Sequence, residues 1–201
     1  MIYQLKITLC DTKPPIWRRL QIPTSATFWD LHLAIQSVFQ WNHTHLHQFL
    51  YDDKVVDKHH KFGIPFEEDE TYGMEVFSSW KHKISKYLNL EEPFIKYVYD
   101  LGDKWLHTIQ LEALLPAEED VIYPRCMKGS RNSPPDDCGG IRGYAAMLEV
   151  LADPAHEDYE SRKVWVESMK GGPFDPEHFD PKMVIFEDPR ERFKDCQVST
   201  F

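Results

Sequence analysis

The sequence predicts an α+β protein: a β-rich N-terminal body with a C-terminal helical pair packed on it. Two observations predict this class. Apolar residues alternate with a period of two through much of residues 1–115, and they recur at helical spacing in residues 140–172. We expect a single domain over residues 1–201, in which residues 116–139 form a loop and residues 173–201 form a tail.

The first predicted strand covers residues 2–9, where apolar and polar side chains alternate as in a half-buried strand. Turn residues follow, and residues 16–22 alternate again, which predicts a hairpin. The apolar side of the first strand is formed by Tyr3, Leu5, Ile7 and Leu9.

A helix is predicted over residues 28–40. Thr27 and Asp30 have the spacing of a capping box, and apolar residues then recur at helical intervals. From His45 to Tyr51 the period returns to two, which predicts a third strand. The resulting order of strand, strand, helix, strand is β-grasp-like, with the helix packed across a sheet.

A later hairpin is predicted where residues 94–99 and 105–112 alternate on either side of a turn that contains Gly102. Residues 52–75, which precede this hairpin, are charged and irregular, and we expect most of them to form a surface excursion. We also expect a short strand over residues 183–186.

The predicted loop of residues 116–139 is rich in proline and glycine and holds Cys126 and Cys138. Long loops of this kind are either functional or flexible connecting segments. Helical spacing resumes after the loop, and Asp153–Pro154 marks the start of a second helix that ends at Gly171. The rest of the chain is mostly polar.

The charge balance disfavours direct nucleic-acid binding. The chain has 33 acidic and 23 basic residues, a net charge of −10, whereas binding to phosphate depends on clustered lysine and arginine. No apolar stretch approaches the roughly 20 residues of a membrane helix. The first residues do not resemble a signal peptide, and the four cysteines are sparse, so we expect a cytoplasmic protein with reduced thiols.

Several sequence motifs resemble one known family, the plasmid pRiA4b ORF-3-like proteins. They are spread over most of the chain in the expected order. The matching segments are Pro15–Arg19, Asp30–His32 with Ile35–Gln36, Trp41 with His45–His47, Tyr99–His107, Tyr123–Cys126, Pro134–Gly140, Gly143–Tyr144, Phe174–Glu177 and Phe179–Asp180. One departure is Leu101, where the family tends to have an aromatic residue.

The resemblance implies an α+β fold but supplies no activity, substrate or cofactor. Some members are labelled as passengers of insertion elements, which suggests an association with plasmid or mobile-element genes. That label also suggests a resolvase, but the sequence has no basic helix-turn-helix tail and no recombinase-like serine context. We therefore do not carry the label over as an activity.

Residues 43–47 contain three histidines at alternate positions. On a strand, His43, His45 and His47 would point to one side, and imidazole is a common transition-metal ligand. Neighbours two apart on a flat strand are about 6.5–7 Å apart, so two rings would have to lean together to share an ion. We favour a hydrogen-bonded polar cluster and keep metal binding as the alternative.

Cys126 and Cys138 are separated by eleven residues and form no Cys-x-x-Cys knuckle. A zinc site would need two further ligands from His45, His47 or His107. Packed free thiols are the favoured interpretation. A Cys138 nucleophile at a helix start, with His107 as its base, is also open, although nearby aspartates oppose thiolate formation.

The third candidate is acidic. Asp100 and Asp103 bracket Gly102, and Asp136 and Asp137 precede Cys138. Paired carboxylates near an imidazole bind cations or share acid–base work, and aspartates at a turn also bond backbone N–H groups. We favour the turn role for the first pair. The complete set of candidate binding residues is Arg18, Asp100, Asp103, Trp105, His107, Asp136 and Asp137, with His107, Cys138 and Asp103 as candidate catalytic groups.

We expect a non-catalytic binding or interaction protein that contacts a protein or a small ligand near the 100–107 hairpin and the 124–140 loop. The alternative is a metal-dependent or cysteine-based hydrolase at the same place, with zinc as a possible cofactor. An enzyme needs these side chains in one pocket, whereas a binding protein allows them to scatter as turn formers.

Overall fold

The computed structural model describes residues 1–53, 58–65 and 76–198. The strands are β1 (Ile2–Leu9), β2 (Ile16–Pro23), β3 (His47–Asp53), β4 (Lys58–Gly63), β5 (Val76–Ser78), β6 (Phe94–Tyr99), β7 (Trp105–Leu115) and β8 (Arg125–Ser130). The helices are α1 (Phe28–Phe39), α3 (Gly140–Ala152), α4 (Tyr159–Lys170) and α5 (Pro189–Val198), with short 3-10 turns η1 (Ile84–Lys86) and η2 (Pro181–Met183).

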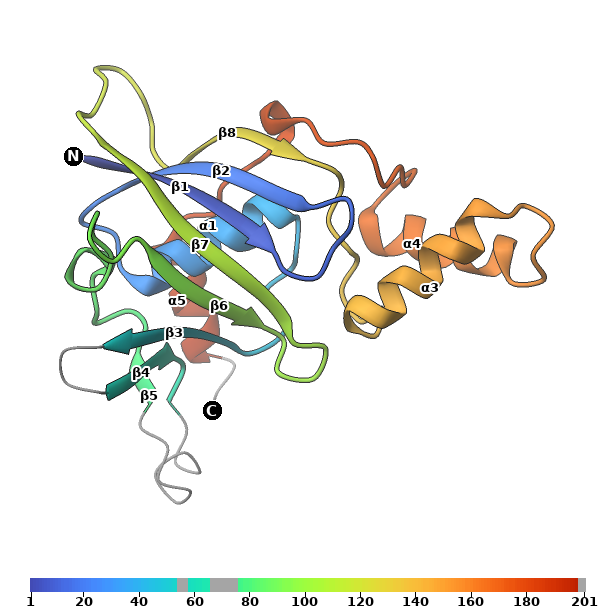
Figure 1. Cartoon of the computed structure of the whole chain (residues 1–201), viewed down its shortest axis with the longest axis horizontal. Coiled ribbons are helices and arrows are strands. Elements are labelled where there is room, and N and C mark those ends of the chain that lie inside the picture. Colours follow the sequence, from blue (N-terminus) through green and yellow to red (C-terminus); the bar gives the residue numbers. More distant parts are fainter. Residues whose placement is uncertain (54–57, 66–75, 199–201) are drawn as a thin grey trace.

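The eight strands form one sheet in the order β5–β4–β3–β6–β7–β1–β2–β8, and only β4 and β5 pair in parallel. Figure 1 shows α1 behind this sheet and the α3–α4 pair beside it. The predicted α+β class and the initial order of strand, strand, helix, strand are confirmed. β3 does not lie beside the first hairpin, because β6 and β7 separate it from β1.

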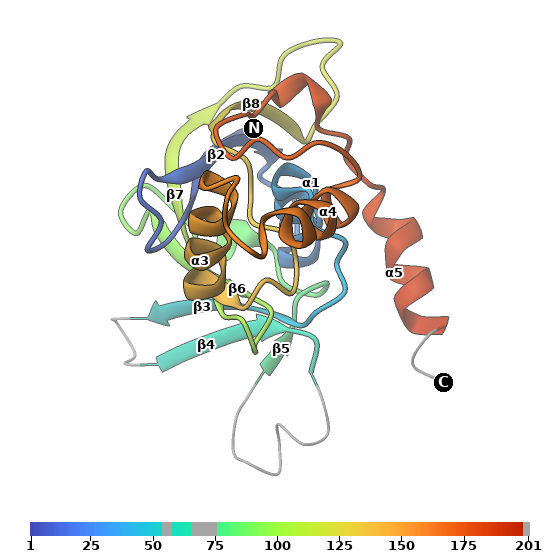
Figure 2. The same ribbon diagram turned by 90° about the vertical axis from the view of Figure 1, so that its right-hand side faces the viewer.

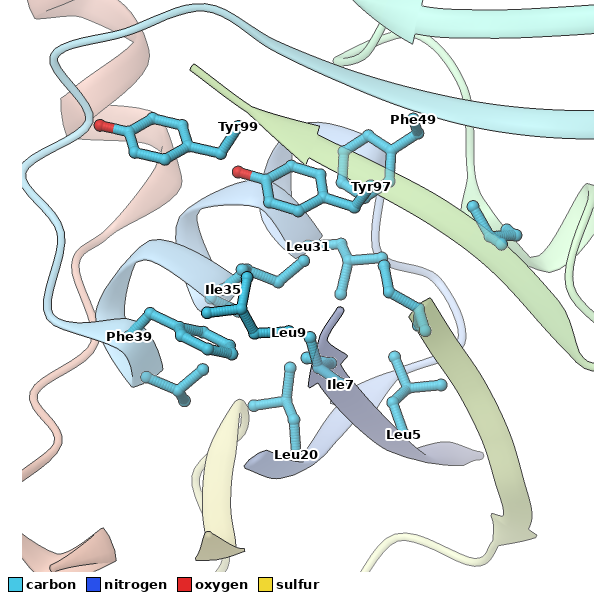
Figure 3. Packing of buried hydrophobic residues seen from close by; sticks show 14 of the residues in the cluster. Leu5, Ile7, Leu9, Leu20, Leu31, Ile35, Phe39, Phe49, Tyr97 and Tyr99 are labelled. Atoms are coloured by element: carbon cyan, nitrogen blue, oxygen red, sulfur yellow. The ribbon is translucent and has the colours of Figure 1, made fainter. Parts of the chain in front are cut away.

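Helix α1 forms where the sequence predicts it. The Thr27 hydroxyl accepts a hydrogen bond from the Asp30 N–H, and the Asp30 carboxylate accepts one from the Thr27 N–H, so the capping box is present. The helix ends at Gln40, which has a φ of 55°. Its apolar stripe packs onto the inner side chains of β1, β2 and β6, as Figure 3 shows. The core therefore lies between α1 and one face of the sheet.

The α3–α4 pair is anchored to this core through Tyr144, Met147 and Val166, which are all buried. Helix α4 begins at Tyr159, later than expected. The Asp153 carboxylate accepts a hydrogen bond from the Ala155 N–H, and its carbonyl accepts one from the His156 N–H, so a turn occupies the predicted first residues.

Three expectations about the less regular segments are wrong. Residues 58–63 form β4, which pairs with β3, so the segment 52–75 is not simply an excursion; residues 54–57 and 66–75 lie outside the described residues. Residues 125–130 form β8, which pairs with β2. Residues 184–186 form no strand, and Ile185 is 84% exposed. None of the described helices has the length and apolar composition needed to cross a bilayer.

Helix α5 was not predicted because its sequence is polar. It lies at the periphery of the body, as Figures 1 and 2 show together. The Trp29 indole N–H donates to the Pro189 carbonyl at 3.0 Å, and Phe193 packs against Trp29 and Trp80. Tertiary contacts at its first turns therefore position this helix.

Candidate functional site

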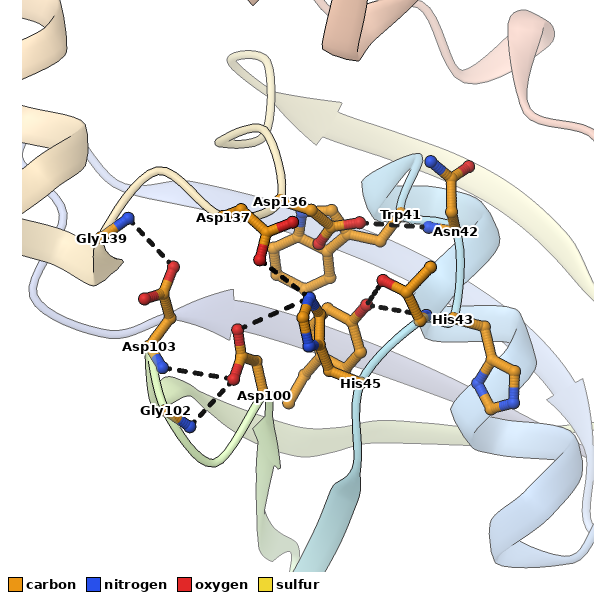
Figure 4. Close-up of polar contacts among 12 residues, drawn as sticks. Trp41, Asn42, His43, His45, Asp100, Gly102, Asp103, Asp136, Asp137 and Gly139 are labelled. Carbon is orange, nitrogen blue, oxygen red and sulfur yellow. Dashed lines mark hydrogen bonds and ion pairs between the residues drawn. The ribbon is translucent and has the colours of Figure 1, made fainter. Parts of the chain in front are cut away.

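Three segments that are distant in sequence meet at one surface: residues 41–45, 100–104 and 131–140 (Figure 4). We call this the three-loop surface. The Trp41 indole N–H donates to the Pro134 carbonyl at 2.9 Å, and the Asp103 carboxylate accepts from the Gly139 N–H at 3.1 Å. The hairpin turn and the long loop that the sequence singled out are therefore brought together.

The turn between β6 and β7 is built by its first aspartate. Asp100 Oδ1 accepts hydrogen bonds from the N–H groups of Gly102 (2.9 Å) and Asp103 (3.3 Å), which is the favoured turn role. The turn packs directly on the start of α3. A Cβ atom at Gly140, where φ is +66°, would lie 2.6 Å from the Asp103 carbonyl oxygen, so only glycine allows this approach.

His45 lies at the centre of the three-loop surface and faces two carboxylates. Its Nε2 is 3.1 Å from Asp137 Oδ1 and 3.8 Å from Asp100 Oδ2. The nearest donor atoms of these three residues all lie within 4.8 Å of one another. Nε2 is shielded from solvent and makes no contact with the geometry of a hydrogen bond, whereas the Asp137 side chain is 63% exposed.

Asp136 lies beside these three residues and is 6% exposed. Its Oδ2 accepts a hydrogen bond from the Asn42 N–H at 3.4 Å, and its Oδ1 is buried without a partner. Burial raises the pKa of the Asp136 carboxyl, while the nearby His45 acts in the opposite direction. We call His45, Asp100, Asp136 and Asp137 the His45 cluster.

The other two histidines of residues 43–47 point elsewhere and meet His32 of α1. The rings of His32 and His47 stack with centroids 3.6 Å apart, and His32 Nε2 hydrogen-bonds His43 Nδ1. His32 Nδ1 hydrogen-bonds the Tyr97 hydroxyl at 2.7 Å. Burial lowers the pKa of His47 to about 3 and of His43 to about 4. These three residues form a buried histidine cluster of neutral rings.

The expectation that His43, His45 and His47 share one side is therefore wrong. β3 begins only at His47, and His43 has a φ of 56°, so the alternation of a strand does not extend back along the chain. His32 was missed as a member of the histidine cluster. Its position did carry a signal, because it lies four residues after Phe28 and three before Ile35, on the apolar stripe of α1.

Trp105 and His107 were predicted as binding residues, and the structure places both in the core, completely buried. His107 packs against Phe39 and Trp41, and one ring nitrogen hydrogen-bonds the Trp105 carbonyl at 2.9 Å. Burial lowers the pKa of His107 to about 3. His107 is thus held as a neutral core residue and not brought to the three-loop surface.

The two candidate cysteines, Cys126 and Cys138, do not have the environment of nucleophiles. Cys10, Cys126 and Cys138 are free thiols. Burial raises the pKa of Cys138 to about 12, with Asp103 adding to the effect, and raises that of Cys126 to about 11. A thiol protonated at neutral pH is a poor nucleophile. The arrangement therefore gives no support to a cysteine-based hydrolase.

Arg18 was also predicted to bind a ligand, and it is 1% exposed. Its guanidinium donates to the Val38 carbonyl at 2.8 Å and the Ser130 carbonyl at 3.0 Å, and it lies over the rings of Phe39 and Phe179. Val38 is in the last turn of α1, where helix carbonyls lack intrahelical partners. Arg18 therefore has a structural role and is not part of the surface site.

A separate recess of about 810 Å³ lies at the N-terminal half of α1, between Tyr123–Pro124 and residues 186–190. Asp30 lines this recess, and its carboxylate is already used in the capping box. The described candidate side chains for ligand binding do not gather there. We therefore take the three-loop surface as the candidate site.

Comparison with known proteins shows which family has this fold and these motifs. The family described as plasmid pRiA4b ORF-3-like protein matches residues 1–183. The protein y4hQ of Sinorhizobium fredii (strain NBRC 101917 / NGR234), described as uncharacterized, is 32% identical over 165 residues, which are 82% of this chain and 80% of that protein.

A solved structure is also similar over nearly the whole chain. It is the crystal structure of MM3350 from Methanosarcina mazei Go1, described as a protein of unknown function. The TM-score is 0.82 with 42% sequence identity, and the match covers 92% of this chain and 98% of that one. With the family match over residues 1–183, these findings show that the chain belongs to the plasmid pRiA4b ORF-3-like family.

Proposed function

We propose that this chain is a non-catalytic binding protein that takes up a positively charged ligand at the three-loop surface. The observation that carries the proposal is the His45 cluster, in which three carboxylates gather around one imidazole where three segments meet. Such a concentration of negative charge attracts cations, and charged clusters also guide partners to a surface.

The way the long loop is held supports binding at this place. Ser133 is completely buried, and its hydroxyl hydrogen-bonds the Phe39 carbonyl and accepts from the Lys170 ammonium at 2.9 Å. Arg131 donates to Glu177 and to the Pro14 carbonyl. A loop fixed at this many points presents its exposed residues in one arrangement, which lowers the entropy lost on binding.

Two sources of positive charge suit this surface: a metal cation, or the lysine and arginine side chains of a partner protein or small molecule. The predicted cytoplasmic location and the association with plasmid or mobile-element genes remain predictions. The acidic net charge of −10 favours the same kind of ligand and disfavours nucleic acid.

The proposal is tested by thermal unfolding of untagged protein with three classes of cationic probe: Mn²⁺, spermidine, and a short peptide of alternating lysine and glycine. At 100 times its dissociation constant, a ligand specific to the folded state adds about 2.7 kcal/mol of stability. We expect at least one class to raise the unfolding temperature by several degrees. The matched variants are Asp137→Asn at the three-loop surface and Glu119→Gln, an exposed residue in the segment between β7 and β8.

The expected result is stabilisation of the native protein and of the Glu119→Gln variant, with a clear loss in Asp137→Asn. If none of the three classes stabilises the native protein, or if Asp137→Asn responds like the native protein to every probe that does, binding at this surface is wrong.

A further inference from the structure

We propose that the cationic ligand is a divalent transition-metal ion, held by His45 Nε2, Asp100 Oδ2 and Asp137 Oδ1, with Asp136 beside it. The inference rests on the proposed function and names its ligand class. These donors come from the segment before β3, the turn between β6 and β7, and the loop before α3, so one ion would join all three segments of the surface.

The separations from His45 Nε2 to the two carboxylates fit a shared ion, and the two carboxylate oxygens lie within 4.8 Å of each other. Two ligand atoms that are each about 2.1 Å from a metal ion lie roughly 3–4 Å from each other. The separations from His45 Nε2 are 3.1 Å to Asp137 and 3.8 Å to Asp100. Asp100 uses its other oxygen, Oδ1, to hold the turn, so Oδ2 is available on a fixed carboxylate.

A buried carboxylate oxygen provides a second, independent observation. Asp136 is 6% exposed and Oδ1 has no hydrogen-bond partner, although burying such an atom unpaired is costly. Figure 4 shows this oxygen on the side of Asp136 that faces His45 and Asp137, while the other oxygen points to Asn42. A cation in the His45 cluster would compensate this oxygen directly or through a bound water.

The ligand set also indicates the class of metal. Calcium and magnesium are bound by oxygen ligands, whereas imidazole together with carboxylates suits manganese, iron or zinc. The described donor group consists of His45, Asp100 and Asp137 and includes no cysteine, so a thiolate-rich zinc site is not what the structure offers. We take Mn²⁺ as the probe because water can complete its coordination and because it is detected directly.

The experiment measures Mn²⁺ binding to untagged, full-length protein at pH 7.5 by the loss of the free-ion EPR signal. We expect one ion per chain. His45→Gln and Asp137→Asn should each weaken binding by at least about tenfold, which is the lower range for loss of metal-supporting groups. His47→Gln, which changes the neighbouring histidine cluster, and Glu119→Gln should bind within a factor of two of the native protein.

The circular dichroism of each variant distinguishes a folding defect from the loss of a metal ligand. The Asp137 side chain is exposed, so we expect its substitution to leave the fold intact. Unaltered Mn²⁺ affinity in both His45→Gln and Asp137→Asn would overturn the inference, and so would the absence of Mn²⁺ binding. If Mn²⁺ does not bind while spermidine or the lysine peptide binds in an Asp137-dependent manner, the assignment of a metal ligand is wrong and the proposed function stands. If all three fail, the proposed function is wrong as well.

Discussion

Two groups of histidines, supplied in part by the same five residues, have opposite environments. His43 and His47 join His32 in the buried histidine cluster under Trp29, whereas His45 faces Asp100 and Asp137 at the three-loop surface. In the first group, aromatic rings surround imidazoles that stay neutral. In the second, carboxylates surround one imidazole whose Nε2 has no hydrogen-bond partner.

The difference shows that residue type and spacing do not decide what a histidine does. Burial without a counter-charge favours the uncharged ring, which then serves packing and hydrogen bonding. Carboxylates at 3.1 and 3.8 Å make the same side chain suitable for a cation. We therefore expect changes in the first group to affect stability, and changes in the second to affect binding.

The largest effect should come from acid. The folded-state pKa of His47 is about 3 and that of His43 about 4, below the ordinary 6.5, so the unfolded chain binds more protons between these values. The contribution of these two histidines to the free energy of unfolding is fully present above pH 6.5, and it is lost as the pH falls below that value. From pH 7.5 to pH 5, each of the two histidines should remove about 2 kcal/mol from the free energy of unfolding.

Urea unfolding at the two pH values measures this loss, and proton NMR of the ring C2–H signals assigns it. His47 signals that do not titrate down to pH 5 are the expected result. A free energy of unfolding that is constant between pH 7.5 and pH 5 would contradict the claim that His43 and His47 are held neutral by burial.

The next largest effect should be the difference between two alanine substitutions. His32→Ala removes a completely buried ring that bonds Tyr97 and His43, and should cost about 3 kcal/mol. His45→Ala removes a partly exposed ring whose Nε2 makes no hydrogen bond, and should cost under about 1 kcal/mol. Chemical denaturation compares them, and equal losses would contradict the division of roles.

Gly140→Ala should connect stability with binding. The new Cβ would meet the Asp103 carbonyl, at a backbone φ that suits glycine, so the turn must move away from the loop. We expect a loss of about 1–2 kcal/mol in the free energy of unfolding. Mn²⁺ affinity should fall too, although no ligand is changed, because Asp100 and Asp137 lie on the two parts that separate. Unaltered affinity in a destabilised variant would show that the two segments need not be held together.

A smaller loss of stability than that of His32→Ala should come from Phe193→Ala in α5. Its ring packs against Trp29 and Trp80 with centroids 5.7 and 5.2 Å away, and such aromatic pairs contribute about 1 kcal/mol. The variant should unfold slightly more easily and show altered tryptophan fluorescence, with Mn²⁺ binding unchanged. A loss of Mn²⁺ binding would mean that the two groups are coupled through α5.

The sequence predicted the elements whose pattern is set by one buried face: β1, β2, α1 and the β6–β7 hairpin. β8 and α5 were not predicted. β8 lies at the sheet edge and has a polar composition, and α5 is held mainly by Phe193 and by contacts at the start of the helix. Their structure depends on tertiary contacts that no local period records.

The candidate site was predicted only in part, because it too depends on tertiary contacts. Asp100, Asp103, Asp136 and Asp137 were singled out from turn and loop motifs, and the structure brings them to one surface. Trp105 and His107 were misplaced because alternation along β7 does not say which of its two faces is buried. His45 contacts Asp137, which is ninety-two residues away in the sequence, and residue spacing cannot predict such a tertiary contact.

The most direct measurement is anomalous X-ray diffraction from a crystal of this protein soaked in MnCl₂. We expect one strong anomalous peak about 2.2 Å from His45 Nε2, Asp100 Oδ2 and Asp137 Oδ1, and none at the buried histidine cluster. A peak at His32, His43 and His47 instead, or no peak in a crystal whose three-loop surface is open to solvent, would contradict this expectation.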